Sequence, residues 1–208
     1  MNYYTLIEKK DINSKFGEIA QGIIIEKQSK FLSFLFKIDS EFEAQEKIEL
    51  IRKENLQARH VVYIYSILEN NITNVKFSDD GEPKGTGTKA IYELIEKEKI
   101  TNICIVIVRY FGGILLGAGP LSRTYLNAAR VCIDSCYKKQ IYNYINYEFE
   151  CNYSVYNILK PKLEEFKNKE EIIIVNSKFN EKVELKLKIA EFNFNNVMKV
   201  IEEFNYDK

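Results

Sequence analysis

Apolar residues in the first two thirds of the chain recur with the two spacings that distinguish β-strands from α-helices. Apolar residues at helical spacing follow a capping Asp39 or Ser40 and predict a helix that ends near Asn55. The unbroken apolar run at 103–108 is short and β-branched, so it predicts a strand buried on both faces. The further strands predicted here are 22–26, 30–36, 60–67 and 75–77, and the further helices are about 88–97 and 121–136.

A shift in composition at 137–140 predicts a domain boundary, and the pattern beyond it has its own regular order. Apolar and charged residues alternate strictly over 183–189, which marks a half-buried strand, and the apolar positions of the last helix repeat every 3.6 residues. Pro161 predicts a kink in the first helix of this part, or a later start of that helix. The elements predicted are strand 142–152, helix 154–167, strand 172–175, strand 183–189 and helix 193–204.

This β-α-β-β-α order is that of a ferredoxin-like split β-α-β unit without its last strand. The fold class predicted for the whole chain is therefore α+β, with an N-terminal domain at 1–137 and a ferredoxin-like C-terminal domain at 138–208.

Charge restricts the classes of partner that this chain can have. Its 208 residues are 46 % hydrophobic and 29 % charged with a net charge of zero, which does not fit a generally basic nucleic-acid binder. All five arginines precede residue 131, and the guanidinium fork suits phosphate and carboxylate, so the first domain is favoured as the recognition half. No apolar run is long enough for a signal peptide or a membrane span, which predicts a cytoplasmic protein with no membrane contact.

The cysteine and histidine residues give little indication of a metal site or of catalysis. The four cysteines lack a C-x-x-C spacing and predict buried, reduced thiols, with Cys132 and Cys136 one turn apart on a single helix. The single histidine, His60, excludes a His-rich metal site, and three roles stay open for it: structural, a contact on a functional surface, or catalytic. We therefore predict no cofactor, no metal ligand and no catalytic residue.

Seven of the nine glycines lie in two short clusters that are flanked by charged residues. Glycine loses more conformational entropy on folding than other residues do, so such clusters indicate positive φ angles or a close approach of another group to the backbone. We expect the two loops to form the working surface of the protein. The first cluster contains Gly81, Gly85 and Gly87, and the second contains Gly112, Gly113, Gly117 and Gly119.

The second cluster joins a buried strand to a helix, where free backbone N–H groups and the helix dipole favour an anion. It is not a Walker-type loop, because Ala118 and Gly119 stand where lysine and serine or threonine are required, and the Rossmann glycine spacing is absent. Three interpretations stay open: tight turns with close packing, an anion or RNA-phosphate site, and a protein-docking loop.

Three carboxylates fall within four residues of the first cluster: Asp79, Asp80 and Glu82. They are compatible with a turn and an interaction surface, with a Mg²⁺ or Ca²⁺ site, or with acid–base chemistry. The Asp-Gly and Glu-Pro pairs are strong turn formers, and the spacing lacks the later ligands of an EF-hand loop.

Several strings over about residues 20–130 match, in order, those of one protein family. They are Ser29-Lys30-Phe31, Ala58-Arg59-His60, Asp80-Gly81-Glu82-Pro83 with Gly85-Thr86, and Arg109-Tyr110-Phe111-Gly112-Gly113 with Leu116-Gly117, Gly119, Leu121, Arg123 and Tyr125. Together they resemble the IMPACT family, whose bacterial branch includes YigZ-type proteins. Leu115 stands where the family often has a lysine, and Pro120 where it often has a glycine.

The resemblance implies both a fold and a role. The N-terminal domain is expected to be an α/β sandwich with the fold of a ribosomal small-subunit protein's second domain, which is also that of the fourth domain of elongation factor G. The C-terminal domain is expected to resemble the fifth domain of the same factor. Because the family is associated with control of translation, the implied partners are RNA, the ribosome or a translation-associated protein.

We therefore expect a non-enzymatic binding protein that acts in regulation of translation through the two loops, with no DNA specificity. The cations would contact phosphate or an acidic surface, the carboxylates would contact a basic partner or orient the arginines, and the glycines would let a partner approach the backbone. The alternative is a metal-dependent phosphate- or nucleotide-handling enzyme, in which the carboxylates hold a metal and the loop 112–119 cradles the phosphate. The candidate binding residues are Lys30, His60, Asp79, Asp80, Glu82, Lys84, Thr86, Arg109, Tyr110, Gly112, Gly113, Gly117, Arg123 and Tyr125.

Overall fold

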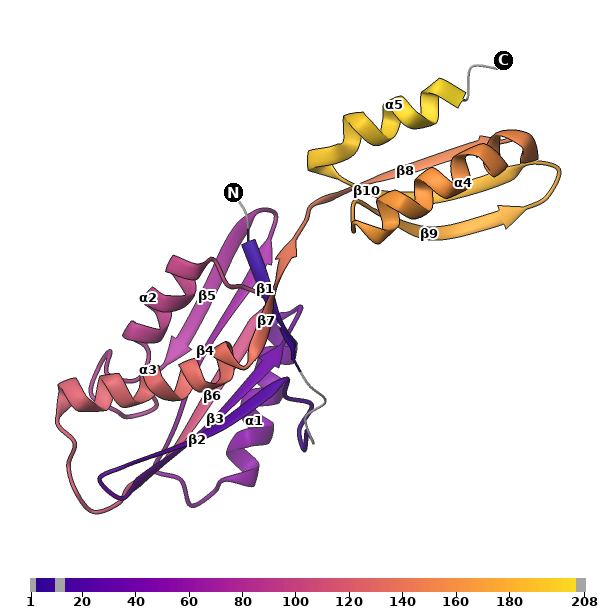
Figure 1. The fold of residues 1–208 in the computed structure, drawn as a ribbon. Helices are drawn as coiled ribbons and strands as arrows, with labels where there is room; N and C mark the ends of the chain where they lie inside the picture. The colour runs from indigo at the N-terminus through magenta and orange to yellow at the C-terminus, as the bar shows by residue number, and fades with distance from the viewer. Residues whose placement is uncertain (1–2, 10–13, 205–208) are drawn as a thin grey trace. The chain divides into compact units, whose positions relative to one another are not determined.

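The chain is divided into two compact units, 1–141 and 142–208, in a computed structural model that describes residues 3–9 and 14–204 (Figure 1). Each unit has helices packed on an antiparallel sheet, so the predicted α+β class is confirmed. The boundary predicted after residue 137 falls inside a strand of the first unit, β7 (Cys136–Ile141). Among the described residues, no helix combines the length and the apolar character needed to cross a bilayer.

A five-stranded antiparallel sheet forms the centre of the first unit. Its strand order is β2-β3-β6-β4-β5, which places the continuous apolar run of β6 in the middle, and β6 is buried on both faces as predicted. The strands are β2 (Ala20–Glu26), β3 (Ser29–Lys37), β4 (His60–Glu69), β5 (Ile72–Ser78) and β6 (Ile103–Tyr110).

The first unit has three layers, because helices cover both faces of this sheet (Figure 1). Helix α1 (Glu41–Glu54) packs on one face, and its N-cap Ser40 accepts a hydrogen bond from the backbone N–H of Glu43, as the capping pattern predicts. Helices α2 (Lys89–Glu98) and α3 (Ala118–Asp134) pack on the other face. Alternate residues of each central strand therefore enter two different cores.

A two-stranded antiparallel ribbon of β1 (Tyr3–Glu8) and β7 was not predicted from the sequence. Both strands are short and carry many polar residues, so neither has an apolar pattern that predicts a strand. Each forms a strand because it pairs with the other. The prediction that α3 continues to Cys136 is consequently wrong, since α3 ends at Asp134 and Cys136 opens β7. All four cysteines are nevertheless buried and free, as predicted.

The second unit has the predicted order of strand, helix, strand, strand and helix. Its sheet order is β8-β10-β9 with antiparallel neighbours, so β8 and β9 run in the same direction with β10 between them. Both helices lie on one face of this sheet, where the apolar residues of β10 form a separate core with them (Figure 1). The elements are β8 (Tyr144–Cys151), α4 (Tyr153–Asn168), β9 (Ile172–Phe179), β10 (Val183–Ala190) and α5 (Phe194–Phe204).

Pro161 does not delay the start of α4, which begins at Tyr153 and continues through the proline to Asn168. The proline is exposed on the helix surface, where water can hydrate the carbonyl that loses its N–H partner. Packing of the apolar face of α4 thus outweighs the local preference for a break.

Candidate functional site

One end of the five-stranded sheet carries a hollow of about 370 Å³, and both glycine clusters line it. We call residues 79–88 the first loop and residues 111–117 the second loop. The first loop contributes Gly81, Glu82 and Pro83 to the wall of the hollow. The remaining lining residues are Arg59, His60, Arg109, Phe111, Leu115, Leu116, Gly117, Ala118 and Leu121. Two segments that are well separated in the sequence therefore meet in one surface.

The strand register explains why charged side chains reach the hollow. Arg109 lies opposite His60 on β4 and opposite Phe31 on β3. Residues directly opposite each other in antiparallel strands point to the same face, here the face covered by α2 and α3. The end of β6 and the beginning of β4 thus deliver a guanidinium and an imidazole beneath the second loop.

A buried ion pair joins the first loop to β6, and the same carboxylate also binds α3. The carboxylate Oε1 of Glu82 accepts a hydrogen bond of 2.6 Å from Nη1 of Arg109 and one of 2.7 Å from the hydroxyl of Tyr125. Glu82 is only 8 % exposed and Arg109 only 5 %, so each charge depends on the other for compensation. Burial and the Glu82 carboxylate raise the pKa of Tyr125, which keeps its hydroxyl protonated as a donor.

His60 ties the first loop to the sheet. Its Nδ1 lies 2.7 Å from the carbonyl oxygen of Asp80, and because a carbonyl only accepts, Nδ1 carries a proton and donates. The other ring nitrogen, Nε2, lies 3.8 Å from Oε2 of Glu82. The histidine is therefore part of the same buried network as the Glu82–Arg109 pair.

The three carboxylates of the first loop point to different partners. Asp79 accepts hydrogen bonds from the backbone N–H groups of Gly85, Gly87 and Thr88, and Asp80 accepts from the N–H of Val61 and from Arg52. Donors of the chain itself therefore bind these carboxylates, and contact of Asp79 and Asp80 with a basic partner stays a prediction. Within the described residues, no group of three or more His, Cys, Asp or Glu is arranged to hold a metal ion.

The glycines of the second loop have different physical roles. A Cβ atom on Gly112 would stand 2.1 Å from the carbonyl carbon of Gln28, so close packing on the β2–β3 turn requires this glycine. Gly113 and Gly117 have φ angles of +84° and +83°, and nothing lies within 4 Å of the place where a Cβ would be. A partner's approach to the backbone is therefore geometrically open at Gly113 and Gly117, whereas the chain itself fills that space at Gly112.

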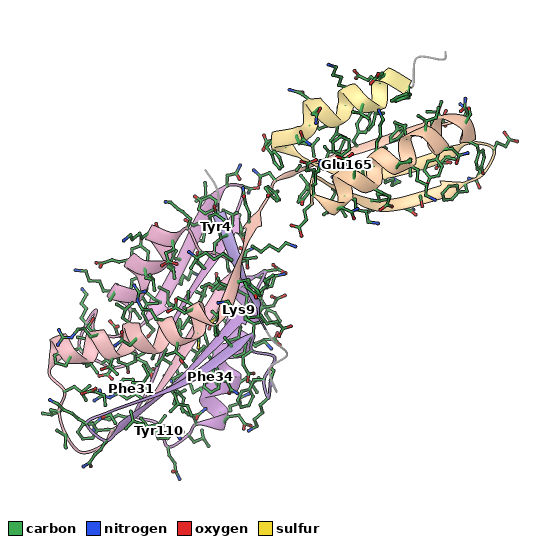
Figure 2. All side chains as sticks on the ribbon, viewed as in Figure 1. Tyr4, Lys9, Phe31, Phe34, Tyr110 and Glu165 are labelled. Carbon is green, nitrogen blue, oxygen red and sulfur yellow. The ribbon has the colours of Figure 1, made fainter. Side chains whose placement is uncertain are left out.

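Two candidate residues lie away from the hollow. Lys30 and Tyr110 are cross-strand partners on the face covered by α1, and the Tyr110 hydroxyl donates a 2.8 Å hydrogen bond to Asn55. Figure 2 labels Tyr110 and Phe31 near the same end of the sheet, and their places in the register give them opposite faces. The sequence motif joins Tyr110 to Arg109, but the alternation of a strand separates their side chains.

The remaining candidates do not line the hollow. Lys84 and Thr86 belong to the first loop without lining the hollow, and the Thr86 hydroxyl donates to the carbonyl of Pro83. Arg123 is exposed on α3, and its Nη1 lies 3.7 Å from the Cβ position of Gly119. Tyr125 is fully buried and acts through Glu82.

Arg59 and Phe111 were not among the predicted contacts although both line the hollow. The Arg59 guanidinium lies 5.5 Å from the centre of the Phe111 ring, and that of Arg109 lies 5.6 Å from it. Their positions in the motifs, beside His60 and Gly112, are the sequence signal that could have found them.

These features define an α+β protein of two units in which two glycine loops meet around a hollow and a buried ion pair fixes the first loop to β6. Residues 27–133, which include both loops, match the family described as "Impact N-terminal domain". The chain belongs to the IMPACT family, as the sequence motifs indicate.

Relatives differ in how much of the chain they match. The "IMPACT family member YvyE" of Bacillus subtilis (strain 168) is 45 % identical over 103 residues, which span 50 % of this chain and 46 % of that protein. The "IMPACT family member YigZ" of Escherichia coli (strain K12) is 29 % identical over 174 residues, or 80 % of this chain and 83 % of that protein. A solved structure titled "Crystal structure of an hypothetical protein" has the same overall fold, with a TM-score of 0.62, 24 % identity, and coverage of 98 % of this chain and 93 % of its own.

Proposed function

We propose that this chain is a non-enzymatic, cytoplasmic binding protein that acts in the regulation of translation by contacting RNA, the ribosome or a translation-associated protein. The contact surface would be the two loops and the exposed residues around the hollow. Membership of the IMPACT family supports the connection with translation, because that family is associated with its control.

The observation that carries this proposal is the Glu82–Arg109 pair. It fixes the first loop to β6 and thereby gives the surface a definite shape before any partner binds. Preorganisation of this kind favours binding because little conformational entropy is lost when the partner arrives. The exposed cations near the loops, Arg59, Lys84 and Arg123, supply the charge that an acidic or phosphate-bearing surface would recognise.

The fold likenesses implied by the family are part of the same proposal. The three-layer first unit would correspond to the fourth domain of elongation factor G, and the β8-β10-β9 sheet to a ferredoxin-like domain that lacks one edge strand. Both likenesses are compatible with a protein that contacts the translation apparatus, although a shared fold alone does not give a function.

The test is co-sedimentation of the purified chain with ribosomes at about 0.05 M and about 0.2 M salt, since phosphate-dominated binding weakens steeply over that range. The variant is Arg123→Ala, and the matched control is Arg130→Ala, an exposed arginine further along the same helix. Salt-sensitive binding that Arg123→Ala weakens and Arg130→Ala leaves intact would support the proposal. If neither ribosomes, RNA nor any translation-associated protein retains the folded chain, the proposal fails.

A further inference from the structure

Strand β2 is an edge strand of the five-stranded sheet, and it lacks the charged residues that the other edge strands carry (Figure 1). It pairs with β3 alone, so the backbone groups on its other side have no strand partner among the described residues. The edge strands β5, β8 and β9 each hold a charged residue before their last position, namely Lys76 in β5, Glu148 and Glu150 in β8, and Lys178 in β9. In β2 the first charged residue is Glu26, the last of the strand. Such charges deter pairing with another strand, so β2 is the edge strand that is open to it.

Two exposed isoleucines lie on one face of this edge strand. Ile23 is 62 % exposed and Ile25 is 69 % exposed, and their register opposite Leu32 and Lys30 places them on the face where α1 packs. Helix α1 packs over β4 and β6, so the part of this face at β2 is left uncovered. Neighbouring exposed apolar side chains beside an unpaired strand edge indicate an interaction surface.

On the opposite face of the sheet, α3 extends the apolar surface to the same edge. Val131 of α3 is exposed, and its Cγ1 atom lies 2.5 Å from the place where a Cβ on Gly22 would be, so its methyl groups rest on the backbone of β2. Ile24 points to this face and is partly buried against the core beneath α3. A strand added beside β2 would therefore meet apolar side chains on both of its faces.

A second copy of β2 fits this edge in an antiparallel register centred on Ile24. This register places Ile23 opposite Ile25 of the second copy, twice by symmetry, and Ile24 opposite itself, so apolar residues face apolar residues. Gly22, which has no side chain, lies opposite Glu26. A centre at Ile25 would instead place Ile24 opposite the charge of Glu26. A strand of another protein would have to supply the same uncharged apolar run, which β2 already supplies for itself.

We infer that β2 is a dimer interface, at which two copies of the chain pair their β2 strands antiparallel about a two-fold axis at Ile24 and join their five-stranded sheets into one. The pairing satisfies the backbone groups of both edges and covers the exposed side chains of Ile23, Ile25 and Val131. This inference goes beyond the proposed function because it concerns a sheet edge outside the two loops and a partner that is the chain itself.

The experiment is sedimentation velocity of the full chain over about a hundredfold range of concentration, since mass action raises the dimer fraction with concentration. The variants are Ile23→Lys and Ile25→Glu, whose exposed positions leave the fold intact, as circular dichroism verifies. Each variant places a charge opposite an isoleucine at two symmetric positions, which should raise the dissociation constant of the dimer at least about tenfold. The matched control is Ile72→Lys, an exposed isoleucine of β5 at the other edge of the same sheet.

Dimers of the parent and of Ile72→Lys that both β2 variants weaken support the inference. An equimolar mixture of Ile23→Lys and Ile25→Glu should dimerise more tightly than either variant alone, because the register brings the introduced ammonium and carboxylate opposite each other. The inference is overturned if the parent stays monomeric over the whole range, if the β2 variants dimerise as the parent does, if Ile72→Lys weakens the dimer equally, or if the mixture gains nothing. Ribosome co-sedimentation with the loop variants is measured separately, so either idea can fail without the other.

Discussion

At the scale of single residues, the buried ion pair of Glu82 and Arg109 connects separate parts of the first unit. Glu82 comes from a loop, and its donors Arg109 and Tyr125 come from a strand and a helix, so one carboxylate joins three parts of the first unit. The sequence places Glu82 and Arg109 in two separate motifs, and it allowed the carboxylates to orient the arginines without indicating which residues would pair. The hydrogen-bond partners of side chains depend on strand register and loop path, which is why only the residue types were predictable.

Replacing Glu82 by glutamine should lower the free energy of unfolding by about 3 kcal/mol, because the Arg109 charge stays buried without compensation. The double variant Glu82→Gln with Arg109→Met should be more stable than that single variant, since the uncompensated charge is gone. Urea unfolding of the two single variants and the double variant measures this. If the two single losses simply add in the double variant, the pair does not have the structural role assigned to it.

The buried thiol of Cys132 should make the free energy of unfolding depend on pH in the alkaline range. Burial raises the pKa of its thiol from an ordinary value of 9.0 to about 12. The folded state keeps the proton at pH values where the unfolded state loses it, so this contribution is complete below about pH 9 and declines as the pH rises toward 12. Between pH 8 and pH 10 the parent should lose about 1.5 kcal/mol more than Cys132→Ala does in urea unfolding. Equal losses would mean that this thiol is not protected from ionisation.

At the scale of elements, the spacing of apolar residues predicted the helices and strands that carry their own apolar pattern. It did not predict the strands that form only by pairing with a distant segment. The helices α1 and α5 and the strands β6 and β10 carry their own apolar pattern, and each lies close to its predicted position. The ribbon of β1 and β7 has no such pattern and forms because the two strands meet. The glycine clusters were recognisable as loops, but their meeting around a hollow is a consequence of the β4–β6 register.

The second loop allows a direct comparison of two neighbouring glycines. Gly112→Ala should destabilise the protein by about 3 kcal/mol, because its Cβ would overlap the backbone of the β2–β3 turn. Gly113→Ala should cost only about 1 kcal/mol, since a positive φ is its single difficulty. Thermal unfolding of the two variants measures the two losses of stability. A similar loss in both would show that the packing against Gln28 is not a constraint on the fold.

At the scale of the whole molecule, the two units have separate hydrophobic cores. The buried clusters of the first unit end at Cys136, and that of the second begins at Cys151. No buried cluster of the described residues draws side chains from both units. Composition alone indicated the division of the chain, whereas the role of residues 138–141 in the β1–β7 ribbon required the strand pairing.

A fragment of residues 1–141 should therefore fold by itself, because it contains the whole of both cores and both loops. Circular dichroism should show a folded α/β spectrum and one cooperative urea transition. The full chain and the fragment 142–208 serve as references. An unfolded or non-cooperative fragment 1–141 would show that the second unit contributes to the stability of the first.

The central claim is that the two loops act as one binding surface, and the most direct test removes one cation from the first loop and one from the beginning of α3, which follows the second loop. Ribosome co-sedimentation is measured at about 0.05 M salt, where phosphate contacts are strongest, with Lys84→Ala, Arg123→Ala and their combination, and with Arg130→Ala as the control. The account predicts that each loop variant weakens binding, that the combination weakens it further, and that the control binds as the parent does. Binding that depends on one loop alone, or that the combination leaves unchanged, would contradict it.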